Sequence, residues 1–184
     1  MIDLRRKSLV ARRAMSREAR ANASSIICKR VLESRLFFAA KRIACYLPMN
    51  DEVDTLTLIE RGWRANKRIF VPVLIGRGKM LFREIRPETP LQRNAFDLWE
   101  PQSGDIISPR NLDLVLTPTV AYDKNNNRIG MGGGYFDRCF AFLRHRQHWL
   151  RPKLVGLAYS CQKVEKISPN VWDIRLYKVF SDSE

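Results

Sequence analysis

The chain has 184 residues, 45% of them hydrophobic and 28% charged, which is typical of a globular protein with one domain. We expect a cytoplasmic protein, because no apolar stretch approaches the roughly 20 residues that cross a bilayer and the charged N-terminus does not resemble a secretory signal. The formal net charge is +14, and residues 1–42 carry twelve Lys or Arg against three acidic residues. Such a field attracts nucleic acids, anionic membranes, nucleotides and acidic small molecules alike, so charge by itself does not identify the partner.

The cysteines and histidines form no familiar metal-binding pattern. The four cysteines are widely spaced and lack a Cys-x-x-Cys pair, which argues against a disulfide scaffold and against a zinc site. His145 and His148 lie three residues apart near the end of a predicted helix, without a third ligand nearby in sequence. We interpret both histidines as surface residues.

The first half of the chain alternates between helical and strand-like segments. Ser16 is a plausible N-cap for a helix that continues to about Ser34, and Ala19, Ala23, Ile27 and Val31 repeat at four-residue spacing along one face of it. Further elements are predicted as a strand over 42–47, a helix over 55–66 with Leu56, Ile59 and Trp63 on one side, and strands over 68–74 and 80–85.

The second half begins with a proline-containing stretch, residues 86–110, which we expect to be a loop. A strand over 112–116, a glycine-rich connection, a helix over 135–145 and a strand over 153–159 follow. Strands that alternate with helices indicate an α/β fold with a mostly parallel sheet. Because ligands bind at the carboxyl ends of such strands, the polar segments 49–54 and 123–134 are expected to face one another across a cleft.

The glycine-rich connection is the most informative segment of the chain. Four of the nine glycines fall at Gly130, Gly132, Gly133 and Gly134, between a predicted strand and a predicted helix. Glycines allow backbone N–H groups to converge on an anion. With Arg128, Arg138 and Asp137 alongside, the segment predicts a phosphate site with a magnesium ligand next to it. The pattern is neither a Walker A loop nor a Rossmann fingerprint, and a simple tight connection stays an alternative.

Residues 117–138 closely resemble the signature of the 5-formyltetrahydrofolate cyclo-ligase (methenyltetrahydrofolate synthetase) family. Three further segments agree in order and spacing: residues 47–55, residues 155–159 with Gln162, and residues 172–174. The resemblance implies a three-layer α/β/α single domain over residues 1–184. It also implies an ATP-dependent ligase that cyclises 5-formyltetrahydrofolate to 5,10-methenyltetrahydrofolate by phosphorylating the formyl oxygen.

The same resemblance assigns roles to individual residues. The implied ATP-binding residues are Arg5, Arg128, Ile129, Gly130, Met131, Gly132, Gly133, Gly134, Tyr135 and Phe136. The implied folate-binding residues are Leu47, Glu52, Met131, Gly132, Gly133, Gly134 and Tyr135. Arg128 and Tyr135 would act in catalysis, and Asp137 and Asp173 would bind Mg²⁺, which prefers hard oxygen ligands. Read without the resemblance, Asp137 is an acid that the helix dipole favours in a first turn, Asp173 a turn acid and Glu52 a surface loop residue.

Two positions depart from the family pattern. The lysine of an N-terminal Lys-x-x-x-Arg motif falls on Met1, so Arg6 or Lys7 would have to replace it after a small change of register. Trp172 stands where many relatives have histidine, and its ring is expected to pack against a ligand or in the core.

Two other functions stay open from the sequence. One is a nucleic-acid-binding module that uses the basic N-terminal helix, although no helix-turn-helix, RRM or zinc-finger pattern supports it and the N-terminal region lacks aromatic residues before Phe37. The other is a relative that binds folate and ATP with little turnover. The partners we expect are therefore 5-formyltetrahydrofolate and ATP, with neither nucleic acid nor membrane, for a protein that acts as a monomer.

Overall fold

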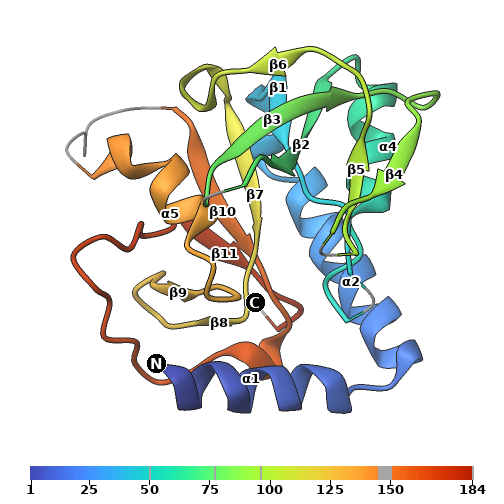
Figure 1. The fold of residues 1–184 in the computed structure, drawn as a ribbon. Helices are drawn as coiled ribbons and strands as arrows, with labels where there is room; N and C mark the ends of the chain where they lie inside the picture. Colours follow the sequence, from blue (N-terminus) through green and yellow to red (C-terminus); the bar gives the residue numbers. More distant parts are fainter. Residues whose placement is uncertain (50, 77, 96, 145–150, 184) are drawn as a thin grey trace.

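The structure is a computed structural model that describes residues 1–49, 51–76, 78–95, 97–144 and 151–183. Its centre is a seven-stranded sheet with the order β11-β10-β7-β1-β2-β3-β6 (Figure 1). The strands are β1 (Arg42–Ala44), β2 (Arg68–Leu74), β3 (Met80–Ile85), β6 (Ile106–Ile107), β7 (Leu114–Pro118), β10 (Lys153–Leu157) and β11 (Lys178–Phe180).

The prediction of a mostly parallel sheet is confirmed. Neighbouring strands from β11 to β2 are parallel, whereas β3 runs antiparallel to both β2 and β6. The antiparallel edge follows from chain length, because the few residues between β2 and β3 are too short for the crossover that a parallel pair requires.

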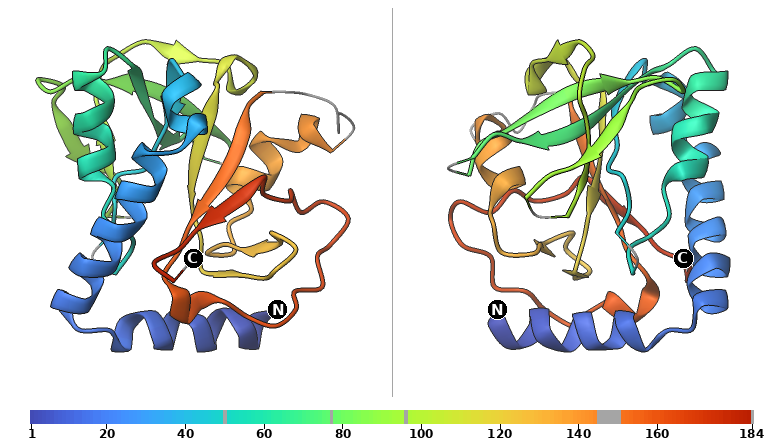
Figure 2. Two further views of the ribbon diagram at one scale, coloured as in Figure 1. Left: turned by 180° about the vertical axis from the view of Figure 1, so that it is seen from behind. Right: turned by 45° about the vertical axis from the view of Figure 1, so that its right-hand side comes forward.

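The two faces of the sheet are covered by different helices, which gives three layers (Figure 2). Side chains alternate along β2: Ile69 and Val71 belong to one apolar cluster, and Phe70 belongs to the other. The first cluster is covered by α2 (Arg17–Leu32), α3 (Arg35–Ala39) and α4 (Leu56–Arg64), and the second by α5 (Tyr135–Cys139) with the 3-10 turn η2 (Ala141–Leu143). The predicted α/β/α fold is therefore confirmed, and its buried strands read as apolar runs because both faces are covered.

The first helix, α1 (Ile2–Ala14), was not anticipated from the sequence. It lies below the sheet in Figure 1, next to the 3-10 turn η3 (Ser160–Gln162) and the hairpin of β8 (Ala121–Tyr122) and β9 (Arg128–Ile129). Leu4 packs on a small cluster that includes Ile129. This contact brings the N-terminus beside the glycine-rich segment.

Helix α2 begins as predicted, because the Ser16 side chain accepts a hydrogen bond from the Ala19 N–H at 3.1 Å. Ala23, Ile27 and Val31 are buried, but the placement of Ala19 on the apolar face was wrong, since the first turn of α2 extends past the ends of the strands (Figure 2).

Helix α4 buries Ile59 as expected, and Trp63 packs against the same apolar cluster, but the placement of Leu56 on this face was wrong. Leu58, Ile59 and Gly62 are buried in it, whereas Leu56 is exposed. A Cβ atom on Gly62 would lie 2.5 Å from the Ile69 side chain, so the helix approaches β2 closely along this glycine face. That approach rotates Leu56 outward.

Several predicted boundaries differ from the structure. The strand predicted over 42–47 ends its ladder at Ala44, the strand over 112–116 begins at Leu114, and the strand over 153–159 ends at Leu157. The helix predicted over 135–145 keeps its α-helical form only to Cys139 and continues as a 3-10 turn, because Phe140 packs among the rings of Phe82, Phe136 and Phe142. His145 and His148 lie outside the described residues.

The predicted loop over 86–110 was also wrong in part. It contains a hairpin of β4 (Leu91–Arg93) and β5 (Trp99–Pro101), as well as strand β6. All three residues of β4 are exposed, so the sequence has no alternation of apolar and polar residues from which this strand could be predicted. The hairpin matters because it forms part of the wall of the cavity described next.

Candidate active site

A cavity of about 850 Å³ opens at the carboxyl ends of the central strands. It lies between the glycine-rich segment on one side and residues after β1 on the other, as expected from the two polar segments. Its lining includes every residue to which the resemblance assigned a ligand: Arg5, Leu47, Glu52, Arg128, Ile129, Gly130, Met131, Gly132, Gly133, Gly134, Tyr135, Phe136, Asp137 and Asp173. The tertiary structure thus brings all of them together, and their individual roles stay predictions.

Asp123, at the start of the second polar segment, does not belong to this lining. It is buried and its carboxylate accepts hydrogen bonds from the backbone N–H groups of Asn125, Asn127 and Ile167. Asp123 therefore shapes the turn between β8 and β9, and only the later part of the segment reaches the cavity.

The glycine-rich segment keeps its backbone open towards the cavity. Gly132 and Gly134 have φ values of 107° and 62°, in the left-handed region that side chains disfavour. A Cβ atom on Gly132 would lie 3.5 Å from the Arg5 guanidinium, whose Nε donates to the Gly130 carbonyl at 2.9 Å. Arg5 in α1 and the glycine-rich segment thus form one wall, although 125 residues separate Arg5 from Gly130.

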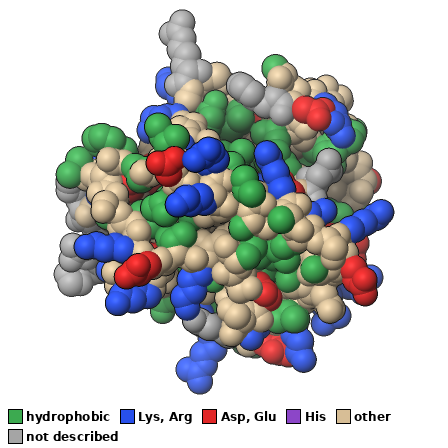
Figure 3. Space-filling model, turned by 90° about the horizontal axis from the view of Figure 1, so that it is seen from below, with side chains coloured by type: hydrophobic (Ala, Val, Ile, Leu, Met, Phe, Trp, Pro, Cys, Tyr) green, Lys and Arg blue, Asp and Glu red, His purple; other side chains and the backbone are tan. Residues whose placement is uncertain are grey.

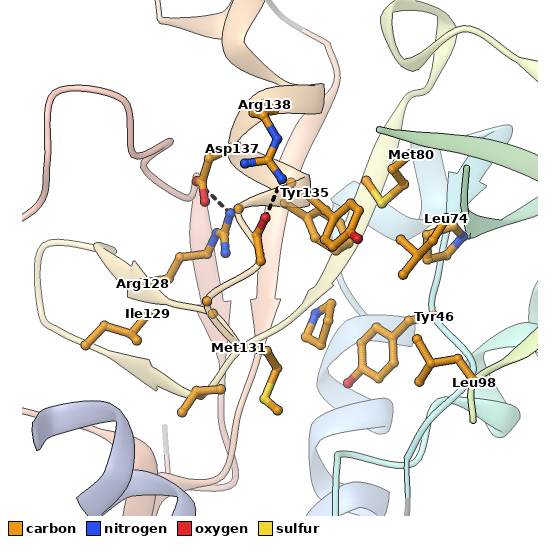
Figure 4. A pocket seen from close by; sticks show the side chains of 18 of the residues that line it. Tyr46, Leu74, Met80, Leu98, Arg128, Ile129, Met131, Tyr135, Asp137 and Arg138 are labelled. Carbon is orange, nitrogen blue, oxygen red and sulfur yellow. Dashed lines mark hydrogen bonds and ion pairs between the residues drawn. The ribbon is translucent and has the colours of Figure 1, made fainter. Parts of the chain in front are cut away.

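Arg128 provides a buried cation in this wall (Figure 4). Only 5% of its side chain is exposed, and its Nη2 donates to Oδ1 of Asp137 at 2.8 Å. Burial lowers the pKa of Arg128, and the carboxylates of Asp137 and Asp173 act in the opposite direction. Its Nε is buried and has no hydrogen-bond partner among the residues that the structure describes. A buried donor without a partner is costly, and a ligand oxygen would relieve that cost.

The two predicted magnesium ligands both line the cavity and are both anchored. Oδ1 of Asp137 also accepts the Ile174 N–H at 3.1 Å, and Oδ2 of Asp173 accepts the Asn170 N–H at 2.7 Å. Within the described ranges, no group of three or more His, Cys, Asp or Glu is arranged to hold a metal ion. Two carboxylates still fit Mg²⁺, because this ion is usually held by one or two carboxylates together with substrate phosphates and water.

The opposite half of the cavity is largely apolar and also contains the carboxylates of Glu52 and Glu100. Figure 4 shows Tyr46, Leu74, Met80 and Leu98 across from Arg128 and Asp137, with Tyr135 between the two groups. Such an apolar slot suits a flat ring system.

Glu52 supplies one carboxylate of this half, and Glu100, which accepts the Leu74 N–H at 2.8 Å, supplies another. Oε2 of Glu52 accepts the Met49 N–H at 3.1 Å, and the Glu52 carbonyl accepts a hydrogen bond from the Tyr159 hydroxyl at 2.8 Å. Burial raises the pKa of Glu52, and the hydrogen bond from Met49 and the charge of Arg12 offset this only in part. A carboxylate in such a place is poised to accept hydrogen bonds from a ligand.

Comparison with known proteins agrees with this geometry. The model of the 5-formyltetrahydrofolate cyclo-ligase family matches residues 2–182. The chain is 38% identical to the 5-formyltetrahydrofolate cyclo-ligase of Haemophilus influenzae over 146 residues, which are 76% of this chain and 75% of that protein. It is 36% identical to the enzyme of that name from Escherichia coli K12, over 94% of this chain and 95% of the relative.

The chain belongs to the 5-formyltetrahydrofolate cyclo-ligase family.

Solved structures support the cyclo-ligase fold. The 5,10-methenyltetrahydrofolate synthetase of Aquifex aeolicus superposes with a TM-score of 0.84 at 28% identity, covering 99% of this chain and 89% of that one. The corresponding protein of Mycoplasma pneumoniae superposes with a TM-score of 0.76 at 25% identity, covering 98% of each chain.

The structure shows which N-terminal residues reach the cavity where the chain lacks the lysine of the family motif. Met1 and Arg5 line the cavity, but Arg6 and Lys7 do not. The Arg6 side chain is 73% exposed and pairs with Asp3 on the same helix. The structure therefore gives no support to the expectation that Arg6 or Lys7 replaces the family lysine, because neither residue lines the cavity.

Sequence reasoning missed several residues that line the cyclo-ligase cavity. Leu98 and Trp99 come from the unpredicted β4–β5 hairpin, and Arg144 follows η2. Arg138, which was expected to flank the glycine-rich segment, donates from Nε to the Gly78 carbonyl at 3.0 Å and from Nη2 to the Gly133 carbonyl. Its guanidinium also lies over the Tyr135 ring at 5.5 Å, so it holds the segment as well as adding charge.

Proposed function

We propose that this chain is an ATP-dependent 5-formyltetrahydrofolate cyclo-ligase that forms 5,10-methenyltetrahydrofolate, ADP and phosphate. The observation that carries the proposal is a single cavity that joins the glycine-rich segment with its buried Arg128 to an apolar slot ending at Glu52. One half suits a polyphosphate and the other a flat, hydrogen-bonding ring. The reaction needs both in contact, because the formyl oxygen must reach the terminal phosphorus.

In the proposed reaction the formyl oxygen attacks the γ-phosphorus and the bond to ADP breaks. N10 then attacks the activated formyl carbon, loses its proton, and expels phosphate as the ring closes. Arg128 and Arg138 are expected to neutralise the charge that develops on the transferred phosphoryl group, with the glycine backbone as further donor. Tyr135 lies between the two halves of the cavity, where its ring keeps the reacting groups aligned.

Mg²⁺ is part of the proposal, with Asp137 and Asp173 as its protein ligands. When bound with a nucleotide, this ion screens the charge of the β- and γ-phosphates. The chain's own contribution is to fix both carboxylates, which it does through the Ile174 and Asn170 N–H groups.

The remaining expectations also stay proposals: one domain over residues 1–184, a monomer, and a cytoplasmic location without nucleic-acid or membrane partners. The family match over residues 2–182 supports the first. Among the residues described, none of the helices combines the length and apolar character that crossing a bilayer requires.

Part of the N-terminal positive charge on which the nucleic-acid alternative depends is engaged within the fold. Arg12 is buried and pairs with Asp51 at 3.0 Å, Arg20 donates to the Met15 carbonyl, and Arg30 donates to the Ser181 carbonyl. These cations hold the fold together. On the face seen from below, which α1 crosses, Lys and Arg are scattered among apolar and acidic side chains (Figure 3).

The test mixes the protein with ATP, Mg²⁺ and 5-formyltetrahydrofolate and follows the absorbance of the methenyl product together with ADP release. We expect stoichiometric formation of both. Binding of ATP and folate without either product would favour the low-turnover relative. Steeply salt-dependent binding of an oligonucleotide, with neither product formed, would favour the nucleic-acid module.

A further inference from the structure

Trp172 is a large apolar side chain left open at the rim of the cavity. It is 56% exposed and belongs to the cavity lining. With respect to the described parts of the chain, its indole makes no hydrogen bond and no ring contact. The backbone on its C-terminal side is fixed, because Asp173 binds the Asn170 N–H and the Ile174 N–H binds Asp137.

The other described tryptophans are engaged. The Trp63 indole N–H donates to the Ile85 carbonyl at 2.9 Å, and the Trp99 ring lies under the Arg93 guanidinium at 4.9 Å. Trp172 therefore presents an indole face that no other group in the described ranges uses, and it lines the same cavity as Arg128 and Asp173.

The position of Trp172 relates it to the phosphate half of the cavity. It directly precedes Asp173, and the segment between η3 and β11 runs from the N-terminus of α1 to α5, where Ile174 meets Asp137 (Figure 1). The apolar slot with Tyr46, Leu74 and Leu98 lies on the other side of Tyr135. If the slot holds the pterin, the base of a nucleotide whose phosphates occupy the glycine-rich segment must leave on the side of Trp172.

We propose that Trp172 is the platform on which the base of the nucleoside triphosphate stacks. This inference rests on the proposed function and adds the residue that holds the base. Stacking on an aromatic face tolerates any base, because each has a π-surface. The side chain of the neighbouring Asn170, a candidate for reading base edges, donates to Asp173 at 3.2 Å instead. We therefore expect Trp172 to strengthen nucleotide binding without selecting adenine.

The experiment measures binding of Mg·ATP, Mg·GTP, Mg·tripolyphosphate and 5-formyltetrahydrofolate by calorimetry to the full-length protein and to Trp172→Leu, Trp172→Phe and Val171→Ala. Leucine keeps the apolar volume but removes the ring, and phenylalanine restores a ring. Val171 is the matched control, since it is 87% exposed next to Trp172 and does not line the cavity.

Trp172→Leu should reduce the affinities for ATP and for GTP by a similar factor, about tenfold or more, and should leave the affinity for tripolyphosphate unchanged. Trp172→Phe should recover most of the loss, and Val171→Ala should bind like the wild type. An equal loss of affinity for ATP and for tripolyphosphate would overturn the proposal, because it would mean that Trp172 acts by positioning Asp173. The proposal would also be overturned if Trp172→Leu bound ATP as tightly as the wild type, or if it lost affinity for folate and not for ATP. Either result would leave the cyclo-ligase function intact. A wild-type protein that binds neither ATP nor tripolyphosphate would remove the proposed function together with this inference.

Discussion

Arg128 and Asp137 form an ion pair across 2.8 Å between the first residue of β9 and the first turn of α5. The guanidinium is almost fully buried and the carboxylate is partly exposed, at 5% and 20% of the side chains. The same oxygen of Asp137 accepts the Ile174 N–H, so the pair joins three segments of the chain. The proposed phosphate donor and the proposed magnesium ligand are thus held in place before any substrate arrives.

Asp137→Asn should reduce both stability and turnover. The amide keeps an acceptor but removes the charge opposite a buried cation, which we expect to cost about 1–3 kcal/mol of unfolding free energy. Turnover should fall by about 100-fold or more, and the Mg²⁺ concentration for half-maximal rate should rise. Urea unfolding and the methenyl assay measure these effects. Asp3→Asn, at an exposed ion pair, is the control and should change neither. If Asp137→Asn needs the same Mg²⁺ concentration for half-maximal rate as the wild type, Asp137 is not a magnesium ligand.

Gly132→Ala should weaken ATP binding beyond its effect on folding. An alanine at φ 107° is strained by about 1–3 kcal/mol, and its Cβ would sit where the backbone faces Arg5. Gly76→Ala is the matched control, because Gly76 has φ 77°, nothing within 4 Å of its Cβ position and no place in the cavity lining. Both variants should unfold at lower urea concentration, but only Gly132→Ala should lose ATP affinity. Equal ATP affinity in the two would contradict the phosphate role of this glycine.

Glu52→Gln should stabilise the protein near neutral pH and weaken folate binding. Because the folded state raises the pKa of Glu52 above its ordinary value of 4.5, the folded chain binds its proton more readily than the unfolded chain. The ionised carboxylate therefore lowers stability above the folded pKa, and this penalty disappears as pH falls towards 4.5. The gain in melting temperature should be present at pH 7 and absent at acidic pH. The KM for 5-formyltetrahydrofolate should rise by about tenfold or more, through loss of a charged acceptor.

The control for this variant is Glu60→Gln, on the exposed side of α4. It should change neither the melting temperature nor the folate KM. A Glu52→Gln protein that is less stable at pH 7 would mean that the carboxylate is more favourable in the fold than its burial suggests.

Asp113 should matter for stability and not for the chemistry. It lies at the start of β7, away from the cavity, and accepts hydrogen bonds from the Lys41 and Arg42 N–H groups and from the Arg42 and Arg151 side chains. Burial acts to raise the pKa of Asp113, but the hydrogen bonds from Arg42 and Lys41 and the charge of Arg42 outweigh it and lower the pKa from 3.8 to about 2.

Asp113→Asn should therefore cost about 2–4 kcal/mol at neutral pH. The difference from the wild type should shrink as pH falls from 3.8 towards 2, where the carboxylate becomes protonated. Asp105→Asn is the control, because Asp105 is 74% exposed and pairs with a half-exposed Arg68. Urea unfolding across this pH range measures the effect, and a reduced turnover per folded molecule would contradict the placement of Asp113 outside the site.

The sequence by itself determined the elements whose signal is local. Strand-like segments that alternate with helical segments predicted a mostly parallel sheet, and Ser16 predicted the start of α2. The glycine-rich segment predicted an open backbone because glycine has no Cβ atom and readily takes positive φ values such as those of Gly132 and Gly134. Such features depend on a few neighbouring residues, so a pattern in the chain is enough to reveal them.

Only the tertiary structure decided how distant segments meet. Arg5 reaches Gly130 because α1 packs on the β8–β9 hairpin, and Trp99 reaches the cavity through a hairpin whose first strand is entirely exposed. The raised pKa of Glu52 comes from the atoms that bury it, and the open face of Trp172 depends on what its surroundings leave uncovered. The physical reason is that burial, desolvation and long-range hydrogen bonds belong to pairs of segments far apart in the chain, and no local periodicity encodes them.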